Sequence, residues 1–190
     1  MPKSAPDRRR QILDAALACF LAKGYLATSM SDIRQRSGAS TGSIYHFFAG
    51  KAGLAEALLR EAIAGWSERT VLPGQSAEAD IKASVRGLAL WGLAHPDQAR
   101  FLDELRGLAM IDPELGAIRA LLTEGHAAAA ARFAQMQSEG TVRDLPFEIA
   151  HSLMLGPVYS YLRQAPPTAP DAAERIADLF ADAAWQAVRR

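Results

Sequence analysis

Small hydroxyl-bearing residues flank a glycine near the start of a short predicted helix, where Thr41, Gly42 and Ser43 follow one another. A hydroxyl can donate or accept a hydrogen bond at the edge of a base, and the threonine methyl group can contact the methyl group of thymine. A glycine in a helix interior costs about 1 kcal/mol relative to alanine, but it lets the backbone come close to another molecule. These residue types suit contact with the major groove of duplex DNA.

Three larger polar side chains follow. Tyr45 and His46 lie one turn further along the predicted helix, where they can reach phosphates that flank the groove. Lys51 begins the next predicted helix and can contact the DNA backbone as a point charge. Ile44 and Phe48, four residues apart, face the other way and hold the helix to its neighbours. Spacing alone leaves a second interpretation open, in which this is an ordinary amphipathic helix that ends at a glycine turn.

Three short helices are predicted to position these side chains, over residues 8–23, 29–37 and 40–48. Ser29 and Asp32 form a capping pattern at the start of the second helix. The turn SGAS separates this helix from the third. Two short helices joined by a turn that contains glycine are typical of a helix-turn-helix, whose second helix enters the major groove.

The charge of the chain is unevenly distributed. The net charge of the 190 residues is zero, yet residues 1–51 hold eight Lys or Arg and three Asp, a net charge of +5. The remaining residues hold thirteen basic and eighteen acidic side chains, a net charge of −5. A basic head on an acidic body indicates a polyanion partner for the head.

The stretch TSMSDIRQRSGASTGSIYHFFAGKAGL resembles the N-terminal domain of TetR-type transcriptional repressors. The matching residues are Ile33, Gly38, Ser40, Gly42, Tyr45, Phe47 or Phe48, Lys51 and Leu54, and the preceding KGY at 23–25 also fits. The strong match covers about residues 8–68. Departures from the family pattern occur at Arg34, Ser37, Ala39 and Ala52. None of them removes a group that is expected to touch DNA.

The resemblance implies a helix-turn-helix DNA-binding domain over 8–68 and a helical effector-binding and dimerisation domain over 69–190. We expect a homodimer that binds a palindromic double-stranded operator and is released from it by a small apolar molecule. The expected DNA contacts are Thr28, Ser29, Ser40, Thr41, Gly42, Ser43, Tyr45, His46 and Lys51.

The rest of the chain is also predicted to be helical, because strand-forming residues are sparse and no convincing period-two alternation occurs. The predicted fold is all-α with about nine helices, the further six over 51–69, 77–94, 96–110, 113–138, 146–163 and 171–188. Leu72-Pro73-Gly74 is a predicted loop. The single cysteine, Cys19, excludes an internal disulfide and is expected in the core. Apolar runs fall short of the ~20 residues of a membrane span, so we expect a cytoplasmic protein.

Aromatic residues, methionines and histidines of the middle helices are candidates for the effector pocket. They are Trp66, Trp91, Phe101, Met110, His126, Phe133, Met136, His151 and Tyr159. Core packing is nevertheless the interpretation that we favour for the aromatic residues and methionines, and a structural role is the one that we favour for both histidines. The dimer interface is expected on 146–188, through one stripe of Phe147, Ala150, Met154, Val158 and Tyr161 and another of Ile176, Phe180, Ala183, Ala184 and Ala187. Either stripe could equally belong to the core of one chain.

Other functions remain open at this point. A helical enzyme is one, although the sequence contains no Walker loop and no GxGxxG pattern. A DNA-binding architectural protein without a ligand is another, and an activator could use the same head. Neither H-x-x-x-H nor H-E-x-x-H occurs, so we expect no metal and no cofactor.

Overall fold

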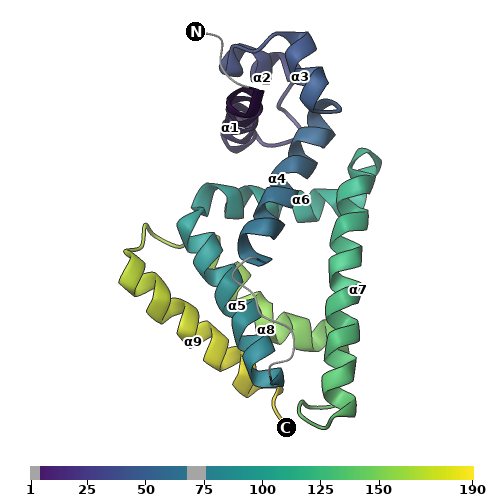
Figure 1. Ribbon diagram of the computed structural model, residues 1–190, viewed down its shortest axis with the longest axis vertical. Helices are drawn as coiled ribbons and strands as arrows, with labels where there is room; N and C mark the ends of the chain where they lie inside the picture. The colour runs from purple at the N-terminus through teal and green to yellow at the C-terminus, as the bar shows by residue number, and fades with distance from the viewer. Residues whose placement is uncertain (1–4, 68–75) are drawn as a thin grey trace. The chain divides into compact units, whose positions relative to one another are not determined.

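Helices account for most of the computed structural model, which describes residues 5–67 and 76–190. They are α1 (Ala5–Lys23), α2 (Met30–Ser37), α3 (Thr41–Phe47), α4 (Gly50–Ser67), α5 (Ala77–Ala94), α6 (Pro96–Ile111), α7 (Gly116–Ser138), α8 (Phe147–Leu162) and α9 (Pro170–Val188), as Figure 1 shows. Within these ranges the prediction of an all-α fold with about nine helices is confirmed. The predicted loop Leu72-Pro73-Gly74 and the predicted boundary between residues 68 and 69 lie outside the described residues.

Local capping signals explain where the helices begin and end. Ser40 caps α3 by accepting a hydrogen bond from the backbone N–H of Ser43 at 3.1 Å. One predicted boundary differs, because Pro113–Leu115 forms a separate 3-10 helix before α7. There the carboxylate of Asp112 accepts the N–H of Glu114 at 2.9 Å, and this short bond favours a tight first turn.

Contacts divide the described chain into two units, and the first contains residues up to 62 together with 101–119. In it α1 packs on α2 and α3 (Figure 1). The buried ring of Phe20 lies 5.3 Å from the ring of Tyr25 and 4.9 Å from that of Phe101, centroid to centroid. Ion pairs from Arg9 and Arg10 to Glu61 join α1 to α4.

Tyr25 is the largest fully buried side chain of this unit. Its backbone N–H donates to Oε1 of Glu104 at 3.1 Å. Its hydroxyl has no hydrogen-bond partner among the described residues. Burial, followed by the nearby charges of Asp112 and Glu114, raises the pKa of Tyr25 to about 12.

The second unit contains residues 63–100 and 120–190. Its core is formed where α5 packs against α8 and α9. Gly92 of α5 permits this packing, because a Cβ atom there would lie 2.3 Å from a side-chain carbon of Leu162. An ion pair of 2.7 Å between Arg86 and Asp178 ties α5 to α9 at the surface. The functional division at residues 8–68 and 69–190 stays a prediction.

Cys19 is buried, as expected, and burial raises the pKa of its thiol. Across the described residues, every helix is too short or too polar to cross a membrane.

Candidate functional sites

The α2–turn–α3 segment is held together by hydrogen bonds that leave one face of α3 open. Ser29 and Asp32 form a reciprocal capping box at the start of α2, with bonds of 3.1 and 2.9 Å. Lys23 donates to the same carboxylate at 2.6 Å. The bond from Lys23 and those from Ser29 hold the pKa of Asp32 well below its usual range. Gly38, with φ of 63°, then ends α2 in the left-handed conformation that glycine adopts readily.

The exposed face of α3 carries four of the nine predicted DNA contacts. Thr41, Gly42, Tyr45 and His46 are exposed, whereas Ile44 on the opposite side is 1% exposed. A Cβ atom added to Gly42 would meet nothing within 4 Å among the described residues. Packing within the chain therefore gives no reason for a glycine at this helical position. Phe48 is buried as well, so the predicted inward face of this helix is confirmed.

Thr28 has a different position from the one predicted. Its side chain is 2% exposed, and its hydroxyl donates toward the carbonyl oxygens of Cys19 at 3.1 Å and Gly24 at 2.8 Å. These carbonyls belong to the end of α1, where the helix leaves acceptors without partners. Because the hydroxyl is enclosed and already bonded, we assign Thr28 a structural role and remove it from the proposed DNA contacts.

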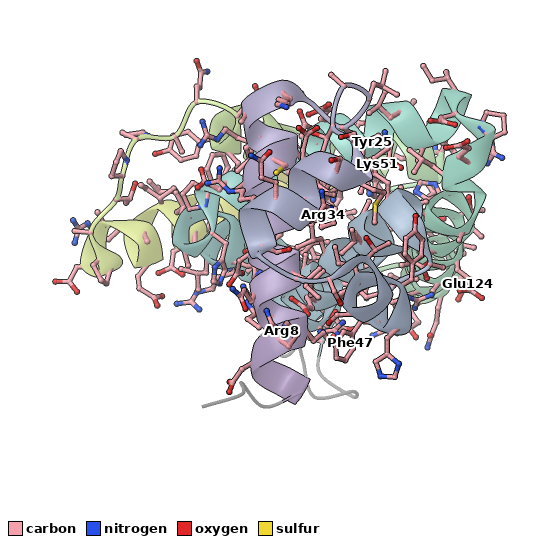
Figure 2. The ribbon with its side chains drawn as sticks, turned by 90° about the horizontal axis from the view of Figure 1, so that it is seen from above. Arg8, Tyr25, Arg34, Phe47, Lys51 and Glu124 are labelled. Carbon is pink, nitrogen blue, oxygen red and sulfur yellow. The ribbon has the colours of Figure 1, made fainter. Side chains whose placement is uncertain are left out.

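Lys51 is also engaged within the chain. Its Nζ donates to the carbonyl oxygens of Tyr25 at 3.1 Å and Leu26 at 3.3 Å. The same atom lies 4.5 Å from the centroid of the Tyr25 ring, and the two side chains lie side by side in Figure 2. Neutral carbonyl acceptors leave the charge of the ammonium in place. Lys51 therefore holds the turn after α1 and still presents a positive charge on the head.

Two arginines of α2 are better placed for phosphate contact than the sequence pattern indicated. Arg34 (Figure 2) and Arg36 are exposed, and neither side chain has an ion-pair partner in the described part of the chain. By contrast, Lys23 pairs with Asp32, so its charge is already compensated. From the sequence, Arg34 was either an added phosphate contact or a solvated surface arginine, and Arg36 had no predicted role. Their location on the first helix of a helix-turn-helix, which crosses the DNA backbone, is the signal that identifies them.

The turn also contains the pattern GxSxG, at residues 38–42, which marks the nucleophile of α/β-hydrolases. In those enzymes the serine lies on a strand-to-helix turn. Here the serine, Ser40, lies between two helices, and its Oγ accepts the N–H of Ser43 as a helix cap. The match provides no nucleophile site.

A partly open cavity of about 200 Å³ lies in the second unit, between α5, α7 and α8. Three of the predicted pocket residues, Phe133, Met136 and His151, line it. Polar groups of Asp80 and Arg132 line it too, and neither residue was predicted. Their pairing joins α5 to α7 across 52 residues of sequence, so no local pattern signals it.

The other predicted pocket residues lie elsewhere. Trp91 is buried, and its ring packs edge-on against that of Trp66 at 5.3 Å, which is core packing. Tyr159 packs against the core of the same unit. Phe101 is buried in the first unit, and Met110, in that unit as well, is 66% exposed.

His126 is close to the cavity without lining it. Its ring lies 5.2 Å from that of His151 and 4.9 Å from that of Phe147, and both of these residues line the cavity. Among the described residues no cluster of His, Cys, Asp and Glu could hold a metal ion.

Comparisons with known proteins agree with this arrangement. The sequence model described as "Bacterial regulatory proteins, tetR family" matches residues 12–58, which contain the whole α2–turn–α3 segment. The full length of the chain matches solved structures of TetR-type regulators in fold. One, from Streptomyces coelicolor A3, has a TM-score of 0.75 at 22% identity, over 94% of this chain and 91% of that one. The chain thus resembles the tetR family in sequence over residues 12–58 and TetR-type regulators in fold over nearly its whole length.

A second similar structure is the ketosteroid transcriptional regulator KstR2 of Mycobacterium tuberculosis, with a TM-score of 0.69 at 22% identity over 100% of this chain and 97% of that one. At this identity both structures show the fold alone. A curated relative, the HTH-type transcriptional regulator BetI from Klebsiella pneumoniae (strain 342), is 36% identical over 94 residues. This match covers 46% of the present chain and about half of the relative, 48%. The names of these similar proteins are those of transcriptional regulators, and none of them names an enzyme.

Proposed function

We propose that this TetR-type protein is a transcriptional repressor that binds a palindromic operator through α3 and leaves it when a small molecule occupies the body. A regulator of this kind acts on the chromosome, in the cytoplasm. The observation that carries the proposal is the exposed face of α3, where hydroxyl, aromatic and imidazole side chains surround a glycine. A helix with such a face can enter the major groove while its buried side stays anchored to α1.

Gly42 provides the sharpest test of the DNA-binding part. Because a Cβ atom there meets nothing within 4 Å in the described part of the chain, Gly42→Ala should raise the free energy of unfolding by up to about 1 kcal/mol. The same Cβ atom would stand between the backbone of α3 and the bases, so affinity for DNA selected from a random pool should fall. Gly125→Ala is the matched control, since Gly125 lies within α7 and also has nothing within 4 Å of its Cβ position. That variant should gain stability and bind DNA like the wild type.

The result that contradicts the proposal is a Gly42→Ala variant that keeps full affinity and the same selected sequences in a mobility-shift assay. Loss of DNA binding by both glycine variants would also contradict it, because the effect would then come from altered stability rather than from the face of α3. The selected sequences themselves should contain inverted half-sites about 34–36 Å apart, or a multiple of that distance.

The homodimer is proposed to form through the outer faces of α8 and α9. Residues of the predicted stripes such as Ala150, Val158 and Ala184 are buried within one chain, so they belong to its core. Other apolar side chains, each next in sequence to a residue of these stripes, stay exposed. They include Ile149 of α8 and Leu179 of α9, and Leu179 is 70% exposed. Exposed apolar side chains grouped on two adjacent helices favour association with a second copy.

Release of the operator is proposed to depend on the cavity in the second unit. A ligand there changes DNA affinity only if it binds one state of the protein more tightly than the other. Couplings of this kind are typically about 1–3 kcal/mol. An architectural role without a ligand remains the alternative, and it is favoured if cavity ligands bind without changing the affinity for the selected operator.

A further inference from the structure

The cavity of the second unit contains a charged group that the described residues leave half satisfied. Oδ2 of Asp80 accepts hydrogen bonds from Arg132, from Nε at 2.9 Å and from Nη2. Oδ1 of the same carboxylate is buried and has no hydrogen-bond partner among the described residues. Asp80 and Arg132 both line the cavity. Native proteins pair nearly all buried polar atoms, so an unpaired buried acceptor beside an internal space indicates a missing donor.

The remaining walls of the cavity are mainly apolar. They include Ile81 and Val85 of α5, Phe133 of α7, and Phe147 and Leu155 of α8. An engineered cavity of about 150 Å³ with walls of this type stays dry and binds benzene. The present volume of about 200 Å³ therefore suits one substituted ring or two fused rings. Apart from Asp80 and Arg132, the polar residues of the lining are Ser84 and His151. The predominance of apolar side chains favours an occupant that is mostly apolar.

The charge of the occupant follows from the ion pair. The guanidinium of Arg132 already compensates the carboxylate of Asp80. A charged ligand would add an uncompensated charge to a mainly apolar space, which is costly. An ionised carboxylate only accepts hydrogen bonds, so the ligand must donate.

We propose that the cavity binds a neutral, largely apolar molecule of one or two rings, whose hydroxyl or N–H group donates a hydrogen bond to Oδ1 of Asp80. This inference rests on the proposed function, since it names the chemical class of the effector. Its direct test is ligand binding alone, which requires neither an operator nor DNA binding.

Three probes with the same ring system separate the features of the ligand. 2-Naphthol carries a neutral donor at pH 7, where phenolic hydroxyls stay protonated. 2-Methoxynaphthalene lacks the donor, and 2-naphthoate carries a negative charge. Isothermal titration of the full chain should give 2-naphthol the highest affinity. Its advantage over the methyl ether should be on the order of tenfold to a hundredfold, as expected for a hydrogen bond to a charged group.

Variants then locate the site. Asp80→Ala should bring the affinities of 2-naphthol and 2-methoxynaphthalene close together, and Arg132 can replace its lost partner with water because its side chain is 38% exposed. Glu78→Gln is the matched control, since Glu78 also belongs to the first turn of α5 but is absent from the cavity wall. It should keep the wild-type preference. Met154→Trp places a larger ring in the cavity wall and should abolish binding of both neutral probes.

The wild-type measurement keeps the inference testable even if a variant does not fold. Equal affinities of the naphthol and its methyl ether, tighter binding of 2-naphthoate, or no binding of 2-naphthol at millimolar concentration would each overturn it. A preference for 2-naphthol that survives Asp80→Ala would overturn it as well. If 2-naphthol binds as expected but the affinity for the selected operator does not change, the cavity assignment stands and ligand-controlled release fails. If the operator is bound but no probe binds, the regulator stands and the cavity assignment fails.

Discussion

Replacing Lys51 with methionine separates two roles that the structure gives to one ammonium group. Methionine keeps an apolar, unbranched side chain but removes the charge and both hydrogen bonds to the carbonyls of Tyr25 and Leu26. Hydrogen bonds that involve a charged group contribute about 1.5–3 kcal/mol, and a cation–π contact at an exposed site about 0.5–1 kcal/mol. Lys51 is only half-buried, and water can replace it at these carbonyls. We therefore expect Lys51→Met to lower the free energy of unfolding by roughly 1–2 kcal/mol.

The second readout is the salt dependence of DNA binding. Each phosphate that a protein neutralises contributes about −0.9 to the slope of log K against log salt concentration. Lys51 keeps its positive charge and is a predicted phosphate contact, so its loss should reduce the slope by roughly one unit. Urea unfolding followed by circular dichroism gives the stability. Mobility shifts of a random-sequence duplex at several salt concentrations give the slope.

Arg36→Gln is the matched control for Lys51→Met. It removes one positive charge from an exposed side chain of the same unit that makes no ion pair in the described part of the chain. It should lower the salt slope by a similar amount but change stability by less than about 0.5 kcal/mol. If Lys51→Met leaves the free energy of unfolding unaltered, the hydrogen bonds from Lys51 to the two carbonyls do not stabilise the fold. If its stability falls while the salt slope stays at the wild-type value, Lys51 holds the turn and does not neutralise a phosphate.

Three further predictions address the buried threonine, the buried tyrosine and the dimer. Thr28→Val should lower the free energy of unfolding, measured by urea unfolding, by about 1–2 kcal/mol, because two carbonyls at the end of α1 lose their donor. Thr41→Val should instead change the selected DNA bases and leave the free energy of unfolding unaltered. Folding raises the pKa of Tyr25 to about 12, so the free energy of unfolding should fall as pH rises from about 10 to 12. Tyr25→Phe should reduce this fall. If the pH profile of the variant is unchanged, Tyr25 is not its cause. Leu179→Asp should yield monomers in sedimentation equilibrium, while the comparably exposed Leu26→Asp should stay dimeric.

The helices and the exposed face of α3 could be predicted because their causes are local. Ser29 and Asp32 lie three residues apart, and their side chains form the capping box that this spacing predicts. Ile44 and Phe48 are four residues apart and both are buried. Each of these features depends on residues within one or two turns of each other, so the sequence itself carries the necessary information.

The polar part of the cavity could not be predicted, because it depends on contacts between distant segments. In the sequence, Asp80 and Arg132 look like ordinary exposed charged residues of two separate helices. Only the fold brings them together, as an ion pair between α5 and α7. The prediction favoured aromatic side chains, and Trp91 instead packs in the core. Periodicity has a similar limit at the predicted dimer interface. It shows that α8 and α9 have apolar faces, but not whether one chain or two will cover Ala150 and Ala184.

Glycines show how a structure can separate folding requirements from functional ones. Gly38 has a φ of 63°, and Gly92 leaves no space for a side chain, so the fold itself accounts for both. Gly42 has neither a positive φ nor a neighbour within 4 Å of its Cβ position. A glycine lowers the stability of this helix, which has only seven residues, and no contact in the described part of the chain offsets that loss. A local rule broken without an internal reason is expected at functional sites. The described residues thus leave space beside Gly42 on the exposed face of α3, where the proposed operator would bind.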